Sequence, residues 1–140
     1  MTEALTIGWS NARAEASRGL YRRTLGLNLF LHLLIGLACI LLPHWISATF
    51  GLPGPIPAGW VRGWGAMLIL VSALYTPGLI DPFRVRLPNL IGLGGRLWLT
   101  IIWLFCGGGF LWFALFDFLF FVILARLYLR FLTNTLMTRP

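Results

Sequence analysis

Four apolar segments of about twenty residues dominate this sequence, at positions 25–42, 61–80, 88–106 and 109–129. A helix needs about 20 mostly apolar residues to cross the hydrocarbon core of a bilayer. Of the 140 residues, 59% are hydrophobic and 11% are charged, whereas about one quarter of a soluble domain is charged. This composition excludes a freely soluble domain, and it excludes a disordered chain because such chains are polar and charge-rich. We predict an all-α, integral membrane four-helix bundle.

The arginines predict the orientation of the chain. All eleven cationic residues are arginine, and the connections at 43–60 and 107–109 contain none of them. The arginines before the first span, between the second and third, and after the fourth are Arg13, Arg18, Arg22, Arg23, Arg84, Arg86, Arg126, Arg130 and Arg139. Cytoplasmic loops of membrane proteins are rich in arginine and lysine. We therefore expect a multi-pass protein of the bacterial inner membrane, with both chain ends in the cytoplasm and membrane lipids, not nucleic acid, as partners.

Residues 1–24 are expected to form a separate unit before the membrane domain of residues 25–130. Apolar residues recur there at spacings of three and four, which is typical of an amphipathic helix lying on the membrane surface. They are Leu5, Trp9, Ala12, Ala16 and Leu20. A partly ordered polar tail is the alternative. Residues 131–140 are expected to form a short cytoplasmic tail.

The connection between the first two spans has a composition of its own. Residues 43–60 include four prolines and three glycines, which argues against a long helix. Aromatic side chains with a polar edge settle at the level of the lipid headgroups, so we expect Trp45, Phe50 and Trp60 to hold this connection along the outer interface. Together with Trp9, these residues are candidates for a docking surface. A cap that faces lipid is the alternative.

Polar and small residues fall on single faces of the predicted spans. The inward face of the first span would carry Asn28, His32, Gly36 and Cys39, that of the second Gly65, Ser72 and Thr76, and that of the third Asn89, Gly92, Arg96, Thr100 and Trp103. Arg62 shares the spacing of the second set, and it could face either the bundle or the lipid headgroups. Residues spaced by three and four share one face of a helix. Small and polar residues pack between helices in a membrane, so these faces should point into the bundle.

Arg96 and Asp117 are the charged pair that the sequence predicts inside the membrane. Counting from Gly108, Arg96 lies 12 residues back and Asp117 lies 9 residues forward. On antiparallel helices this offset is about 4.5 Å along the axis, which an arginine side chain can cover. An unpaired charge at the centre of a bilayer costs at least about 2.5–3.5 kcal/mol. We therefore predict an ion pair that either fixes the register of the two helices or forms part of a quinone or proton site.

No arrangement typical of a catalytic or metal site appears in the sequence. It contains no HExxH, paired CxxC, GxSxG or phosphate-loop motif. His32 could bind the iron of a haem or the magnesium of a chlorin, although a hydrogen bond to Asn28 or to a neighbouring helix is the simpler role. Candidate contacts to a quinone or pigment are Asn28, His32, Tyr75, Arg96 and Asp117.

The order of these features resembles the small four-helix membrane proteins of the DoxX-like and BphX-like group. The resemblance rests on an arginine-led first span, the Asp81-Pro82-Phe83-Arg84 turn, a mid-helix arginine in the third span and an aspartate in the fourth. It implies a four-helix bundle, and some members are small membrane subunits of quinone-linked redox enzymes. Asp81, Arg96 and Asp117 are the positions that correspond.

Three functions are consistent with these features. The first is a non-catalytic accessory subunit of a larger inner-membrane electron-transfer or photosynthetic complex. The second is a quinone-binding membrane subunit of a redox enzyme. The third is a free-standing small transporter. The small size, the aromatic surfaces and the lack of catalytic motifs favour the first.

Overall fold

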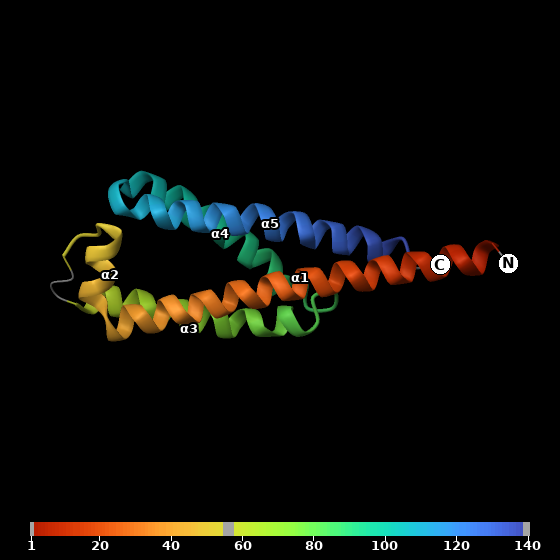
Figure 1. The fold of residues 1–140 in the computed structure, drawn as a ribbon, viewed down its shortest axis with the longest axis horizontal. Helices are drawn as coiled ribbons and strands as arrows, with labels where there is room; N and C mark the ends of the chain where they lie inside the picture. The colour runs from red at the N-terminus through yellow and green to blue at the C-terminus, as the bar shows by residue number, and fades with distance from the viewer. Residues whose placement is uncertain (1, 55–57, 139–140) are drawn as a thin grey trace.

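The computed structural model describes residues 2–54 and 58–138, with side chains from residue 10 onward. Regular structure in this part of the chain is entirely helical (Figure 1). The elements are α1 (Thr2–Leu41), α2 (Pro43–Phe50), α3 (Gly59–Ile80), α4 (Arg86–Cys106), the 3₁₀ turn η1 (Gly108–Phe110) and α5 (Leu111–Leu136). Four segments are long and apolar enough to cross a membrane, namely Ser10–Leu41, Gly59–Ile80, Arg86–Cys106 and Gly108–Leu136. The predicted all-α chain with four candidate membrane spans is confirmed.

The first helix differs from the expectation of a separate unit at residues 1–24. α1 runs without a break through residue 24 and includes the first candidate span. Residues 10–24 contain no proline, and alanine and arginine favour helix there. Ser17 and Tyr21 are buried, so this stretch belongs to the bundle. At the other end of the chain, α5 continues to Leu136, so most of the expected tail is helical.

The four long helices form a ring of neighbours. α1 contacts α3 and α5, and α4 contacts the same two helices. Figure 1 shows the two ends of the chain at one end of the molecule, with α2 and the α4–α5 turn at the other. The connection at 43–60 is not wholly irregular, because α2 occupies its first half. α2 packs against the α4–α5 turn, where a Cβ on Gly109 would overlap the carbonyl oxygen of Phe50.

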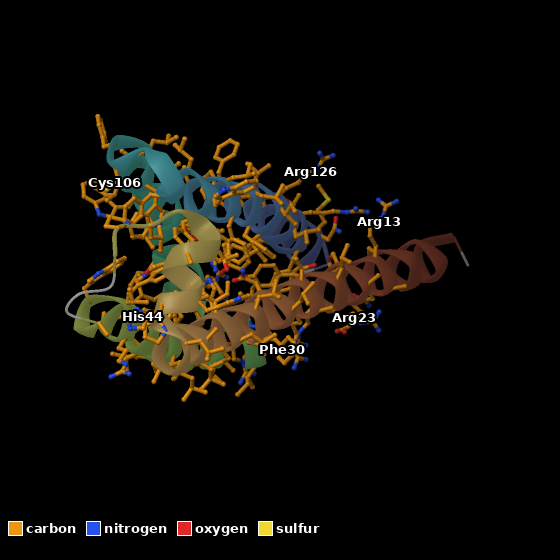
Figure 2. All side chains as sticks on the ribbon, turned by 60° about the vertical axis from the view of Figure 1, so that its left-hand side comes forward. Arg13, Arg23, Phe30, His44, Cys106 and Arg126 are labelled. Atoms are coloured by element: carbon orange, nitrogen blue, oxygen red, sulfur yellow. The ribbon has the colours of Figure 1, made fainter. Side chains whose placement is uncertain are left out.

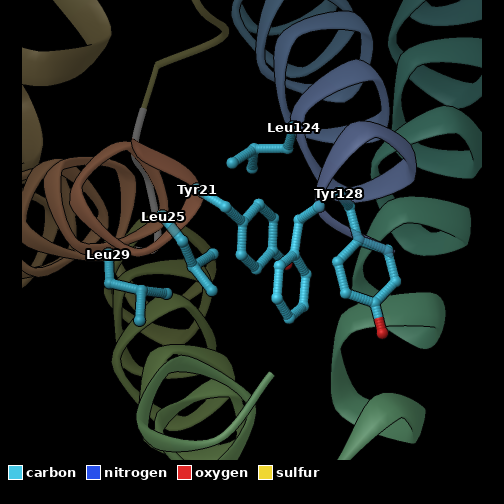
Figure 3. Packing of buried hydrophobic residues seen from close by; sticks show 6 residues of the cluster. Tyr21, Leu25, Leu29, Leu124 and Tyr128 are labelled. Atoms are coloured by element: carbon cyan, nitrogen blue, oxygen red, sulfur yellow. The ribbon is translucent and has the colours of Figure 1, made fainter. Parts of the chain in front are cut away.

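Two apolar clusters occupy the two ends of the bundle. The cluster nearer the chain ends joins α1 to α5 (Figure 3) and consists of Tyr21, Leu25, Leu29, Leu124, Tyr128 and Phe131. The cluster beneath α2 consists of Cys39, Ile46, Leu52, Val61 and Phe113. Many large apolar side chains outside these clusters are exposed, including Phe105 at 86% and Trp112 at 61%. Figure 2 shows how densely side chains cover the outside of the helices. Such an exterior suits a lipid environment.

Glycine brings α1 and α3 into backbone contact. A Cβ on Gly36 would lie 2.8 Å from the carbonyl oxygen of Gly65, and a Cβ on Gly65 would lie 2.7 Å from the Cβ of Cys39. Without side chains at both positions, the two helices approach closely, as small residues allow in membrane proteins. Gly36 and Gly65 are therefore on the inward faces that the spacing predicted, whereas Arg62 and Thr76 of the second span are exposed.

Candidate functional site

A layer of buried polar side chains lies between the two apolar clusters. The α4 residues Asn89, Gly92, Arg96 and Thr100 are all buried, because their spacing of three and four places them on the face that meets the other helices. On α1, Asn28 and His32 are buried, and on α5 Asp117 is the buried acid. The site is therefore assembled from three helices, and we call Asn28, His32, Arg96, Trp103 and Asp117 the polar layer.

The structure brings Arg96 and Asp117 into contact. Arg96 Nη1 donates to Asp117 Oδ1 at 3.1 Å, and the two side chains are only 5% and 11% exposed. The Gly107–Gly109 turn allows this, because Gly107 and Gly108 adopt positive φ angles of 65° and 54°, which glycine accepts readily. The turn makes α4 and α5 antiparallel neighbours, so the register counted from Gly108 brings the two charges together.

The other terminal nitrogen of Arg96 points toward α1. Arg96 Nη2 donates to Asn28 Oδ1 and lies 3.1 Å from His32 Nε2. The guanidinium thus contacts one charged and two neutral side chains from two other helices. His32 therefore contacts a residue of a neighbouring helix, Arg96 of α4, rather than Asn28 of its own helix. Charge-assisted hydrogen bonds of this kind are about twice as strong as neutral ones.

The carboxylate of Asp117 has a second donor. Trp103 Nε1 donates to Asp117 Oδ2 at 3.2 Å, so both oxygens accept a hydrogen bond. Trp103 also stacks on Phe110 with ring centroids 5.4 Å apart, which orients the indole. Aromatic rings cover the layer as well, since the guanidinium carbon of Arg96 lies 5.7 Å from the Phe120 ring centroid. The ion pair is therefore enclosed by its own chain.

Space inside the layer is scarce. The cavity that reaches Arg96 has a volume of about 10 Å³ and is also lined by Tyr21, Tyr75 and Gly92. That is roughly the space of one water molecule. Asn28 Nδ2 and His32 Nδ1 are buried and have no hydrogen-bond partner within the described residues. Neither of these two residues lines the cavity, and a ring the size of a quinone would not fit in it.

Tyr75 separates this interior from a larger outward cavity. A Cβ on Gly92 would overlap the Tyr75 ring, so the glycine makes room for the tyrosine between α3 and α4. On its outer side Tyr75 lines an apolar cavity of about 310 Å³, together with Val71, Leu74 and Ile91. Gly94 and Gly95 meet nothing within 4 Å, so of the glycines at 92–95 only Gly92 serves a close approach.

The residues predicted for docking differ in exposure. Trp45 and Trp60 are exposed at 57% and 38%, whereas Phe50 is half-buried and packs on Phe113 at a centroid distance of 5.3 Å. The side chain of Trp9 lies outside the described residues. Phe50 is thus a packing residue of the cluster beneath α2, and through Phe113 it joins a group of rings in edge-to-face contact that includes Trp64 and Trp103.

Two elements of the site were not predicted from the sequence. Trp103 was placed on the inward face of its span, but its bond to Asp117 was not foreseen. Asn89 donates through Nδ2 to the carbonyl oxygen of Gly78 at 3.1 Å and thereby joins α4 to α3. Pro82 indicates this contact in the sequence, because it has no N–H to donate to the carbonyl oxygen of Gly78 four residues earlier.

Metal binding is not supported by the arrangement of side chains. Across residues 10–54 and 58–138, no three histidine, cysteine, aspartate or glutamate side chains are placed to hold a metal ion. His32 Nε2 faces a guanidinium, which a bound iron or magnesium would have to displace, so the residues around His32 do not fit a haem or chlorin. Comparisons of the chain with family models, curated proteins and solved structures find no match.

Proposed function

We propose that this chain is a non-catalytic accessory subunit of a larger inner-membrane complex that carries out electron transfer or light capture. The observation that carries the proposal is the closure of the polar layer. Arg96 has partners from its own chain on both terminal nitrogens, and the adjoining cavity holds about 10 Å³. An enzyme or transporter needs polar groups that a substrate can reach, whereas a structural subunit needs a layer that fixes the register of its helices.

The exterior supports the same proposal. Exposed aromatic side chains project from the outer faces of α4 and α5, including Trp98 at 64% and Trp112 at 61%. Aromatic residues are enriched where proteins meet. Association with partner subunits is the measurement that tests the proposal.

The experiment is purification of the tagged, full-length chain from its own membrane in mild detergent. We expect large membrane subunits that bear haem, iron–sulfur or pigment absorption to elute with it in a fixed ratio. Trp98→Ala combined with Trp112→Ala should weaken this association, whereas Leu119→Ala, another exposed position, should not. Elution of the wild type as a lone monomer or homo-oligomer would contradict the proposal.

A quinone-binding subunit is the second candidate, and the outward cavity at Tyr75 is the observation in its favour. The apolar walls of this cavity of about 310 Å³ suit a prenyl tail, and the Tyr75 side chain also lines the small cavity that reaches Arg96. This reading agrees with the resemblance to DoxX-like proteins. Organic extraction of the pure protein tests it: quinone in the wild type that is lost in Tyr75→Ala would favour this function over the first.

We also propose that both chain ends face the cytoplasm. The arginine distribution favours this orientation, and the two cysteines of the chain can be used to test it by chemical labelling. Cys106 is free and exposed at the end of α4, whereas Cys39 is buried. A membrane-impermeant maleimide is applied to cells whose outer membrane is permeabilised and whose inner membrane is intact. It should label Cys106. It should not label the cysteine introduced by Arg13→Cys in a Cys106→Ser background. Labelling at position 13 but not at Cys106 would show the opposite orientation and contradict this proposal.

A further inference from the structure

A large cavity lies at the end of the bundle that carries the chain termini, away from the polar layer. Its volume is about 490 Å³, it is open on one side, and three separate segments line it. α1 contributes Glu15 and Arg18, the α3–α4 turn contributes Asp81 and Arg84, and α5 contributes Phe131. The proposed function makes no use of this cavity.

The charged residues in the cavity wall are two cations and two acids, and the contacts among them leave part of their hydrogen-bonding capacity unfilled. Arg18 Nε is buried and has no hydrogen-bond partner within the described residues. The pair between Arg84 Nε and Asp81 Oδ2 spans 3.8 Å, and the Arg84 side chain is 87% exposed. Glu15 is exposed. A buried donor without a partner is costly, so a ligand oxygen near Arg18 would stabilise the folded protein.

The cavity borders the apolar interior of the bundle on its inner side. Phe83 and Phe131 meet there edge to face, with ring centroids 6.4 Å apart, and Phe131 belongs to the apolar cluster of Figure 3. Arg22 Nε donates to the carbonyl oxygen of Leu79 at 2.9 Å, just before the turn. Arginine side chains are concentrated in the cytoplasmic segments next to membrane spans, at the level of the lipid headgroups. The cavity therefore opens at headgroup depth.

We propose that this cavity binds a phosphoethanolamine headgroup, taken from a phospholipid of the surrounding leaflet. The phosphate accepts hydrogen bonds from Arg18 and Arg84, and the ammonium donates to Glu15 and Asp81. Arginine suits phosphate because its planar donors match phosphate oxygens. The balanced set of charges favours a neutral zwitterion: the two carboxylates would repel a purely anionic headgroup, and a choline headgroup has no N–H to donate to them.

The experiment uses the full-length protein in nanodiscs that contain phosphatidylethanolamine, phosphatidylcholine and phosphatidylglycerol in equal amounts, with identical acyl chains. Native mass spectrometry then counts the lipids that remain bound. The variants are Arg18→Gln and Glu15→Gln, and the matched control is Arg13→Gln, which removes the same charge from an exposed position of α1 outside the cavity. Circular dichroism verifies that each variant keeps its helices.

We expect the wild type and Arg13→Gln to retain phosphatidylethanolamine above the other two lipids. Arg18→Gln should weaken this retention about tenfold, as for loss of a hydrogen bond to a charged group, and Glu15→Gln should reduce the preference over phosphatidylcholine. Equal retention of all three lipids by the wild type would overturn the proposal. So would an Arg18→Gln protein that folds and retains phosphatidylethanolamine like the wild type.

A second arm separates the lipid from a soluble source of the same headgroup. Glycerophosphoethanolamine is titrated onto the protein in nanodiscs that lack phosphatidylethanolamine. Binding clearly weaker than that of the lipid supports the assignment to the leaflet. Binding as tight as that of the lipid would overturn it and identify a soluble ligand.

Discussion

Two arginine–aspartate pairs in the described residues have the same chemistry and opposite surroundings. Arg96 and Asp117 lie 3.1 Å apart with side-chain exposures of 5% and 11%, whereas Arg84 and Asp81 lie 3.8 Å apart with exposures of 87% and 33%. The buried pair has further contacts from Asn28, His32 and Trp103. The exposed pair has only the backbone N–H of Arg84, which donates to Asp81 Oδ1.

This difference shows that the residue types do not decide what an ion pair contributes. In a low-dielectric interior, removing one partner leaves a charge that neither water nor another group can satisfy. At the surface, water replaces the lost partner, and measured exposed pairs contribute about 0–1 kcal/mol. The buried pair should therefore govern the folding of the bundle, and the exposed pair should be free to exchange its partner for a ligand.

The largest effect is expected for Asp117→Ala. It leaves the Arg96 guanidinium buried with only neutral partners, and we expect the free energy of unfolding to fall by about 3–5 kcal/mol. Arg96→Ala should have a similar effect. Unfolding in mixed bicelles, followed by circular dichroism as the denaturing detergent is increased, measures both.

The double variant tests the pairing itself. Arg96→Ala with Asp117→Ala removes both charges, so it should be milder than either single variant. Phe118→Ala, an exposed position one residue along α5, is the control for shortening a side chain and should cost about 1 kcal/mol or less. If the effects of the two single variants simply add, the buried pair does not couple the helices.

The buried pair could be predicted from the sequence because its geometry is local. A turn of three glycines between two apolar spans fixes which residues of neighbouring helices share a level, and Arg96 and Asp117 fall within one helical turn of each other. The inward faces were predictable for a related reason, since polar groups in a membrane must avoid lipid. Gly36, Gly65 and Gly92 all lie where a close approach between helices requires them.

The partners of Arg96 on α1 could not be derived in this way. Asn28 and His32 lie 68 and 64 residues from Arg96, and periodicity does not indicate which helix faces α4 across the bundle. The cavity at the chain ends depends on three distant segments and has no local signature. The unbroken course of α1 is compatible with the sequence, because no proline interrupts residues 10–41; amphipathic spacing alone does not distinguish a separate surface helix from the extension of a membrane span.

A smaller effect is expected for Trp103→Phe. The change removes the donor to Asp117 Oδ2 and keeps a ring to stack on Phe110, so stability should fall by about 1 kcal/mol. The control is Trp98→Phe on the same helix, where the indole is 64% exposed and stability should not change. In an Asp117→Ala background the loss should disappear. A cost that persists there would assign Trp103 to packing rather than to the carboxylate.

The smallest effect is expected for Asp81→Asn, and it tests the comparison most directly. The same change of aspartate to asparagine at position 117 removes a buried charge, whereas at position 81 it removes an exposed one and keeps an oxygen that can accept from the Arg84 N–H. In detergent without phospholipid, Asp81→Asn should change the free energy of unfolding by less than about 0.5 kcal/mol, against several kcal/mol for Asp117→Asn. Because an exposed pair is screened by salt, the small effect at position 81 should vanish at about 1 M salt while the effect at position 117 persists. Equal costs at the two positions would mean that burial does not distinguish the pairs.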